Sequence, residues 1–366
     1  MVIEVELKRK IIHVDMDAFY ASIEMRDHEQ YRNKPLVIAR DPRHTGGRGV
    51  VTTANYTARH FGIHSAMSAQ EAYRLCHQAV FVKPDFAKYK QVSSEIHTIF
   101  YEYTDKVEPI AFDEAYLDVT SNKYGLTSAL RVAKMIQQEI FSKTHLTCST
   151  GVSYNKFLAK LASDYHKPAG VTLVLPEEVH SFLGTMPIEK FRGVGKKTAP
   201  KMHQLGIKTG NDLLKWNEVE LIAKFGKIGQ VLYQRVRGID ERPVEWKRKR
   251  KSIGFERTLG QPLKSSVEVD DMLHFLAAKL AKTIQQKQKH GKTLVLKLRN
   301  SQFETVTKRM TFDDYLVNDK ENYAFWGRQL FDQIQPDEVD VRLLGLTLTN
   351  IDELKFENIK LPLWKK

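Results

Sequence analysis

Two short acidic motifs in the first third of the chain carry residue types that could hold a metal ion. Asp15-Met-Asp17 ends an apolar run, and Asp113-Glu114 lies between two further apolar segments. Carboxylates that are crowded at strand ends repel one another, and a divalent cation is the simplest way to neutralise them. Oxygen ligands without Cys or His favour Mg²⁺. For either motif alone, turn or capping carboxylates are an equally good interpretation.

The Asp-x-Asp motif after an apolar strand also occurs in haloacid-dehalogenase-type phosphatases and in metal-dependent glycosyltransferases. The phosphatase pattern expects Thr or Val two residues after the second Asp, where this chain has Phe19, and no lysine context typical of a phosphatase follows. The motif by itself therefore does not decide between these classes of enzyme.

Short strands mixed with helices must position these carboxylates. Residues 11–17 read as a buried strand, and a helix follows at 19–27. The mixture favours an α+β sheet domain over a doubly wound one. We further expect strands at 35–40, 49–53, 107–112, 115–119 and 146–152, and helices at 56–61, 89–103 and 128–141.

The second half of the chain contains three regions with different sequence patterns. Residues 187–240 read as mainly helical and include Gly193-Val-Gly195, which is typical of a helix-hairpin-helix. Residues 246–254 are too rich in Lys and Arg to pack, so we expect a tether there. Apolar residues at helical spacing and then at alternating spacing predict a second α+β domain beyond the tether.

Charge points to a polyanionic partner. The chain has 366 residues and a net charge of +13, and residues 242–312 hold 17 Lys and Arg against 6 Asp and Glu. This concentration favours nucleic-acid binding, although a solvated basic surface is the simpler alternative. Cys76 and Cys148 have no disulfide or zinc spacing, and neither a membrane span nor a signal peptide is recognisable, so we expect a cytoplasmic protein.

Taken together, the motifs resemble those of the Y-family translesion DNA polymerases. They occur in the order expected of that family and cover most of residues 11–350. The matching stretches are IIHVDMDAFYASIE (11–24), TANYTARHFGI (53–63), DEAYLD (113–118), GVSYNKFLAKLASD (151–164), HKPAG (166–170), the Gly193-Val-Gly195 hairpin and KSIG (251–254).

The resemblance implies a right-hand polymerase with a ferredoxin-like palm, small fingers, a helical thumb with a helix-hairpin-helix and an α+β little finger. It implies a monomer that binds primer-template DNA and deoxynucleoside triphosphates, and no membrane. The expected boundaries are 1–27 and 80–176 for the palm, 28–79 for the fingers, 177–245 for the thumb, 246–254 for the tether, 255–350 for the little finger and 351–366 for a tail.

By the same resemblance, Asp15, Asp113 and Glu114 are the catalytic, metal-binding carboxylates, and the backbone carbonyl of Met16 is a further ligand. Two Mg²⁺ ions would activate the primer 3′-hydroxyl and neutralise the triphosphate and the departing pyrophosphate. Asp17 is left open between this site and a structural turn.

The resemblance also assigns residues around the nucleotide. Tyr20 is the steric gate that excludes a ribose 2′-hydroxyl. Small residues over the nascent base pair predict low fidelity and tolerance of damaged template bases, and no second acidic cluster suggests a proofreading exonuclease. The triphosphate contacts would be Thr53, Tyr56, Arg59 and Lys167, and the residues over the base pair Val50, Thr52 and Ala66.

Two positions depart from the family pattern. Ahead of Asp113 the chain has Ala111-Phe112 where similar enzymes carry Ser and then Ile or Leu; in a regular strand this removes a hydroxyl near the primer terminus and would affect the rate. The tail only loosely resembles a sliding-clamp-binding peptide, through Leu361, Leu363 and Trp364, and a last strand packed on the core is equally possible.

DNA contacts are expected where backbone amides or cations can reach phosphates. A non-enzymatic, polymerase-like DNA-binding scaffold is the alternative to an active enzyme. The expected DNA contacts are Gly193, Gly195, Lys247, Arg248, Lys249, Arg250, Lys251, Lys297 and Arg299.

Overall fold

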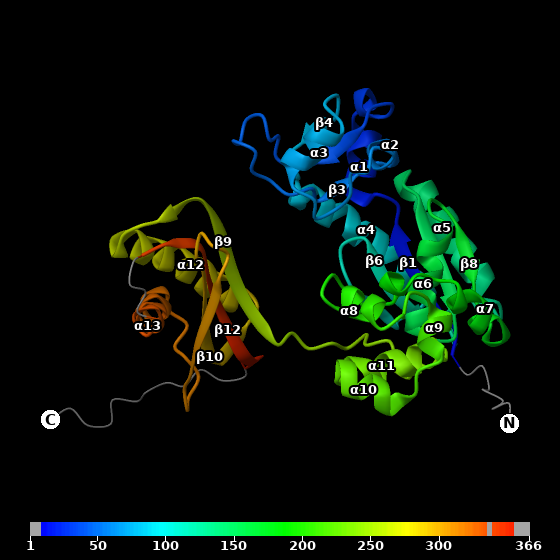
Figure 1. Cartoon of the computed structure of the whole chain (residues 1–366). Helices are drawn as coiled ribbons and strands as arrows, with labels where there is room; N and C mark the ends of the chain where they lie inside the picture. The colour runs from blue at the N-terminus through cyan, green and yellow to red at the C-terminus, as the bar shows by residue number, and fades with distance from the viewer. Residues whose placement is uncertain (1–8, 335–338, 355–366) are drawn as a thin grey trace. The chain divides into compact units, whose positions relative to one another are not determined.

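A computed structural model describes residues 9–334 and 339–354, and it divides into two compact units, Met1–Arg248 and Lys249–Lys366 (Figure 1). Each unit is described by itself. No helix in the described ranges is both long and apolar enough to cross a bilayer.

A five-stranded sheet forms the centre of the first unit, in the order β5-β6-β1-β7-β8. Strand β1 is central and pairs antiparallel with both β6 and β7. With the helices that connect them, the first four strands of this order give the ferredoxin-like arrangement that the resemblance implied. The strands are β1 (Ile11–Met16), β5 (Val107–Pro109), β6 (Glu114–Asp118), β7 (Cys148–Ser153) and β8 (Val171–Leu173).

Helices cover both faces of this sheet. On one face α1 (Phe19–Asp27), α4 (Phe86–Tyr103) and α5 (Ala129–Thr144) bury a core with the even-numbered residues of β1. On the other face lies α6 (Lys156–Tyr165). It approaches β7 closely because Gly151 has no side chain: a Cβ there would lie 2.0 Å from the carbonyl oxygen of Ala159. The odd-numbered residues of β1 therefore face α6.

A small sheet is inserted between β1 and α4, in the order β3-β2-β4. Of the strand predicted at 49–53 only Thr53 is in β3, because Gly46, Gly47 and Gly49 hold positive φ and Val50 makes one isolated bridge. The last strand, β4, lies beyond residue 79. The elements are η1 (Glu29–Tyr31), β2 (Leu36–Ile38), β3 (Thr53–Ala54), α2 (Tyr56–Arg59), α3 (Ala69–Leu75) and β4 (Val80–Val82).

A bundle of short helices with its own apolar core completes the first unit. Gly193 adopts φ +105°, and a Cβ there would lie 2.7 Å from Ile228, so this hairpin position requires glycine. The elements are η2 (Pro176–Glu178), α7 (Val179–Gly184), η3 (Ile188–Lys190), α8 (Thr198–Gln204), α9 (Gly210–Leu214), α10 (Glu218–Phe225) and α11 (Lys227–Val236).

The second unit is a four-stranded antiparallel sheet, in the order β11-β10-β12-β9, with two helices against one face. Its first strand begins at Ser252, inside the range predicted as a tether, because Ile253 pairs with Leu348 and is buried. The elements are β9 (Ser252–Leu263), α12 (Ser266–Gln286), β10 (Lys289–Arg299), β11 (Thr305–Thr311), α13 (Lys320–Asp332) and β12 (Val341–Glu353).

Candidate active site

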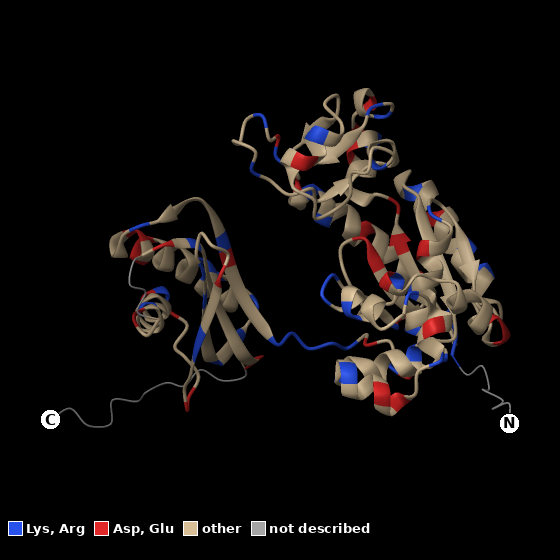
Figure 2. Ribbon diagram, viewed as in Figure 1, with Lys and Arg blue, Asp and Glu red and all other residues tan. Residues whose placement is uncertain are grey.

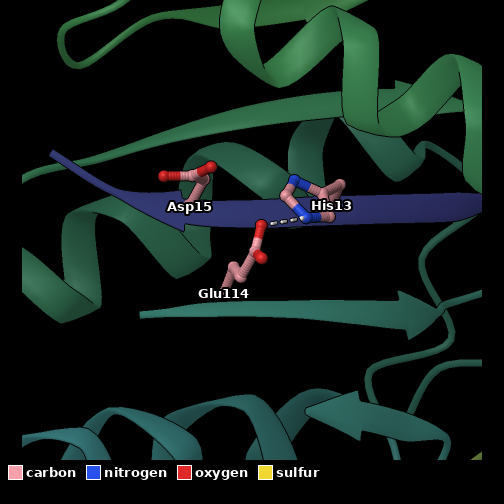
Figure 3. A group of neighbouring side chains, drawn as sticks. All are labelled: His13, Asp15 and Glu114. Atoms are coloured by element: carbon pink, nitrogen blue, oxygen red, sulfur yellow. Dashed lines mark ion pairs between the residues drawn. The ribbon is translucent and has the colours of Figure 1, made fainter. Parts of the chain in front are cut away.

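The pairing of β1 with β6 brings the two acidic motifs together. Asp15 lies directly opposite Glu114 in the strand register, and the backbone N–H of Met16 donates to the carbonyl oxygen of Asp113 over 2.9 Å. Residues almost one hundred positions apart in the sequence thus meet at one end of the sheet. Figure 3 shows Asp15 on β1 and Glu114 on the neighbouring strand. We call Asp15, Asp113 and Glu114 the acidic corner.

Two lysines are paired with the acidic corner. The Lys160 Nζ of α6 lies 2.7 Å from Asp15 Oδ2 and 2.9 Å from Glu114 Oε2, and the Lys167 Nζ lies 2.6 Å from Asp15 Oδ1. Burial raises the pKa of Asp15, but the two ammonium groups outweigh it and hold that pKa below its usual value. Burial likewise opposes the ionisation of Glu114, yet His13 and Lys160 lower its pKa to about 2. Both carboxylates are ionised at neutral pH.

Asp113 is the carboxyl group that these lysines do not neutralise. Burial first, and then the charges of Asp15 and Glu114, raise its pKa to about 6. The raised pKa of Asp113 thus reflects its burial first and, in addition, the negative charge of the two neighbouring carboxylates. Ligands that are mainly oxygen atoms, together with this unbalanced charge, fit a hard divalent cation such as Mg²⁺.

His13 also belongs to this neighbourhood, although the sequence interpretation gave it no role. Ligand atoms of His13, Asp15 and Glu114 all lie within 4.8 Å of one another (Figure 3). The His13 Nε2 is 3.3 Å from Glu114 Oε2, and its Nδ1 is 2.8 Å from Ser163 Oγ. The ring is fully buried, and burial lowers its pKa. The ring is thus held through Ser163 and lies beside the Glu114 carboxylate.

Sequence reasoning missed both His13 and Lys160, and each had a signal in the sequence. His13 is two residues before Asp15, so on a strand both side chains share a face. Lys160 stands four residues before Asp164, one helical turn away, and the two side chains form an ion pair of 3.7 Å.

Asp17, which the sequence left open, makes a different set of contacts. Its Oδ1 accepts a hydrogen bond of 2.7 Å from Ser149 Oγ, and its Oδ2 accepts one of 2.8 Å from the backbone N–H of Ala169. The Tyr56 hydroxyl lies 3.4 Å from Oδ1. Asp17 is buried, and its bonds anchor the loop that carries Lys167.

The candidate triphosphate contacts come from three places: β3, α2 and the segment between α6 and β8. Tyr56 and Arg59 stand on α2, where the Arg59 guanidinium lies 4.9 Å from the centre of the Tyr56 ring and its Nε donates to the Ala54 carbonyl. Thr53 is buried in the preceding strand. Lys167 reaches the same region from the palm side through Asp15. Tyr56 and Lys167 thus each contact an aspartate of the Asp15-Met-Asp17 motif, Tyr56 at Asp17 and Lys167 at Asp15.

Tyr20 lies in the first turn of α1, and its ring is stacked on Tyr89 with centroids 4.4 Å apart and planes 14° from parallel. Burial, followed by the charge of Asp113, raises the pKa of the Tyr20 hydroxyl, so this side chain is close to the acidic corner. Phe112 meets Tyr20 edge-on at 6.5 Å.

The expectation of a regular strand through Ala111 and Asp113 was wrong. Strand β5 ends at Pro109 and β6 begins at Glu114, so residues 110–113 form the connection between them. The reason is local: both the Ile110 and Ala111 backbone N–H groups donate to the Glu114 carbonyl, which closes a tight turn. The side chains at 111 and 113 therefore need not share one face, as they would in a regular strand.

Comparison with known proteins identifies the family. The impB/mucB/samB family model matches residues 14–164, its C-terminal domain matches 250–361, and the HHH motif of the IMS family matches 176–207. The chain is 50% identical over 347 residues to a protein named DNA polymerase IV from Streptococcus agalactiae, and 51% identical over 348 residues to one from Streptococcus thermophilus, covering 95% of each chain. The chain belongs to the impB/mucB/samB family.

A solved structure supports this assignment. A Y-family DNA polymerase chimera superposes with a TM-score of 0.85 at 29% identity, and the match covers 94% of this chain and 99% of that one. The right-hand fold with a ferredoxin-like sheet, expected from the sequence, is thereby confirmed as that of the Y family.

Within this impB/mucB/samB member, the candidate DNA contacts are spread over three regions. Gly193 and Gly195 form the turn before α8, inside the matched HHH motif. Residues 247–251 form an exposed basic segment (Figure 2). Lys297 and Arg299 lie on the sheet face of the second unit that α12 and α13 leave open; Lys297 Nζ is 2.7 Å from Glu256 Oε2. The clamp peptide predicted at Leu361, Leu363 and Trp364 lies outside the described residues.

Proposed function

We propose that the chain is a template-directed, Mg²⁺-dependent DNA polymerase of the low-fidelity translesion type. The single observation that carries this is the acidic corner, in which three carboxylates from two distant motifs meet beside Tyr20 and Lys167. Its relatives named DNA polymerase IV share half of its residues over nearly the whole chain. The domain boundaries remain those predicted from the sequence, except that the tether ends before Ser252 and β4 belongs to the small sheet of the fingers.

The reaction joins the primer 3′-oxygen to the α-phosphorus of the incoming nucleotide and releases pyrophosphate. Asp15, Asp113, Glu114 and the Met16 carbonyl would hold two Mg²⁺ ions, which supply activation of the hydroxyl and charge neutralisation of the triphosphate. His13 and Lys160 hold Glu114 in place.

The remaining residues position the nucleotide. Tyr56, Arg59 and Lys167 carry donors suited to phosphate oxygens, and Thr53 adds a hydroxyl beside them. Tyr20 lies under the sugar and excludes a 2′-hydroxyl. Val50 is 60% exposed, and with Thr52 and Ala66 it leaves room over the base pair, which reduces discrimination between correct and damaged pairs.

DNA is held without sequence specificity by the hairpin at Gly193 and Gly195, by the cations at 247–251, and by Lys297 and Arg299. We propose that the enzyme works as a monomer in the cytoplasm and that residues 361–364 bind a sliding clamp. Deleting residues 355–366 should then abolish stimulation by the clamp and leave extension without the clamp unchanged.

The test is primer extension on an undamaged template with Mg²⁺ and all four deoxynucleotides. Asp113→Ala should abolish extension, whereas Asp105→Ala, an exposed aspartate of the same unit, should not. A wild-type chain that binds primer-template and adds no nucleotide with any divalent ion would instead be the non-enzymatic scaffold, which the intact acidic corner argues against.

A further inference from the structure

Tyr20 rests on a second tyrosine that the proposed reaction does not use. Tyr89 lies on α4, is completely buried, and stacks nearly parallel to Tyr20 with the ring centres 4.4 Å apart. Phe86 closes one side of this stack, edge-on to Tyr20 at 6.0 Å. An aromatic pair in this arrangement contributes more than the area that it buries. Tyr89 is therefore a floor on which the Tyr20 ring lies.

Tyr89 is itself held in place by a hydrogen bond. The Tyr89 hydroxyl donates a hydrogen bond of 2.7 Å to Glu24 Oε1, and Glu24 is almost fully buried. The other carboxylate oxygen of Glu24 pairs with Lys88 Nζ at 2.8 Å. Glu24 stands four residues after Tyr20 on α1, so both side chains share the helix face that meets α4. One helix thus supplies the ring above Tyr89 and the carboxylate that holds its hydroxyl.

This arrangement limits how far Tyr20 can move. A ribose 2′-hydroxyl could be accommodated if the Tyr20 ring moved away from the sugar by a fraction of its thickness. Movement toward α4 would press it into Tyr89, whose ring cannot turn aside while its hydroxyl is bonded to Glu24. Packed interiors resist such shifts because they have no free volume to absorb them.

We propose, resting on the proposed polymerase activity and on Tyr20 as its steric gate, that Tyr89 is a positioning residue which sets discrimination against ribonucleotides. Tyr89 does not touch the nucleotide. It acts by preventing the Tyr20 ring from moving away from the sugar. Glu24 acts in turn by holding Tyr89 in place.

The experiment measures kcat/KM for single-nucleotide addition of a deoxynucleotide and of the matching ribonucleotide. In the ratio of the two values, any change in the active fraction of the enzyme cancels. Tyr89→Leu removes both the ring and the hydroxyl and should lower the ratio by roughly 10-fold, with deoxynucleotide addition reduced much less. Tyr89→Phe keeps the ring, loses only the bond to Glu24, and should lower the ratio by about 2- to 3-fold.

A matched control lies on the same helix. Tyr103 is also buried in α4, and its hydroxyl also donates to a glutamate, Glu139, over 2.6 Å, but its neighbour in the ring stack is Tyr124. Tyr103→Phe should leave the ratio unchanged. Tyr20→Ala gives the lowest ratio expected in this assay, because it should remove most of the discrimination.

The outcomes separate the two hypotheses. A wild-type chain that extends no primer overturns the polymerase proposal and the role of Tyr89 together. If the wild type discriminates and both Tyr89 variants lower the two efficiencies equally, Tyr89 is merely structural and this inference alone fails. Tyr89→Phe provides the answer if Tyr89→Leu does not fold.

Discussion

The five-stranded sheet of the first unit and the four-stranded sheet of the second unit carry charge in different ways. In the first unit, charged residues converge at the end of β1, where Asp15 is 8% exposed and lies within ion-pair distance of two lysines, one of which also pairs with Glu114. In the second unit, cations are spread along β10 and β11 on a face that α12 and α13 leave open. A site that must bind metal ions needs dense, partly buried charge, whereas a surface that follows a duplex needs dilute, exposed charge.

The partners of the charged side chains also differ between the acidic corner and the open sheet face of the second unit. At the acidic corner Asp15 and Glu114 each have a lysine partner, and the pKa values of Asp113 and Glu114 depart from their usual range in opposite directions. On the open sheet, Lys297 lies opposite Thr307 and reaches Glu256 across Gly345, which has no side chain to obstruct it. Exposed pairs of this kind contribute little to stability and can be exchanged for phosphate at low cost.

The largest effect is expected for Asp113 in the acidic corner, where one substitution should lower activity and raise stability. Asp113→Asn should lower the rate of nucleotide addition by about 10³-fold or more. The same change should stabilise the metal-free protein at pH 7.5 by roughly 1 to 2 kcal/mol, because a carboxyl pKa raised to about 6 means that ionised Asp113 destabilises the folded state. Thermal unfolding in EDTA measures this gain.

The pH dependence of that gain has a definite sign. Folded Asp113 takes up a proton as the pH falls through about 6, while the unfolded chain does so only near about 4. The wild type thus loses its penalty gradually as the pH falls from about 6 to about 4, so the advantage of Asp113→Asn should be smaller at pH 5 than at pH 7.5 and should disappear only below about pH 4. An advantage that is equal at pH 7.5 and pH 5 would contradict the charge excess at this corner.

The second effect concerns Lys160. Lys160→Met removes the ammonium group that pairs with both Asp15 and Glu114 and leaves only Lys167 beside Asp15, so it should destabilise the protein in EDTA by about 2 kcal/mol. Excess Mg²⁺ should restore much of this loss, since a cation that binds the folded state takes over the neutralisation. The measurement is the melting temperature with and without Mg²⁺.

Lys156 provides the control for this experiment. It lies one turn earlier on α6, is more deeply buried than Lys160, and also forms an ion pair, with Glu108 at 2.6 Å. Lys156→Met should also destabilise the protein, but Mg²⁺ should restore nothing. Equal recovery of both variants would show that the effect of Mg²⁺ is not local to the acidic corner.

The smallest effect is expected on the open sheet. Lys297→Ala should weaken primer-template binding only a few-fold and reduce the slope of log affinity against log salt by about 1. Glu256→Gln releases Lys297 from its ion pair and should strengthen binding. Both are measured by titration of labelled primer-template at several salt concentrations.

Neither substitution on the open sheet should change the rate at saturating DNA. Lys320→Ala serves as the control, because Lys320 stands on α13, which covers the opposite face of the sheet. A change in the salt slope for Lys320→Ala as large as that for Lys297→Ala would break the proposed distinction between the two faces.

Local elements were predicted well where periodicity was strong. The helix at 19–27 has the predicted bounds, and β1 and the apolar alternation of β10 were recognised. Predictions failed where long-range contacts decide the outcome. The strand expected at 49–53 is reduced to its last residue by glycines, and β9 begins inside the range predicted as a tether because β12 provides backbone partners for Ser252 and Ile253.

The sequence by itself determined which chemistry is available: carboxylates at strand ends, a tyrosine one helical turn beyond them, and cations gathered in the second half of the chain. Periodicity placed these residues on elements, because it reflects each element's own geometry. Only the tertiary structure decided that Asp15 faces Glu114, that Lys160 neutralises both, and that Tyr89 lies under Tyr20. Those pairings depend on strand register and helix packing between distant segments, and no local pattern specifies them.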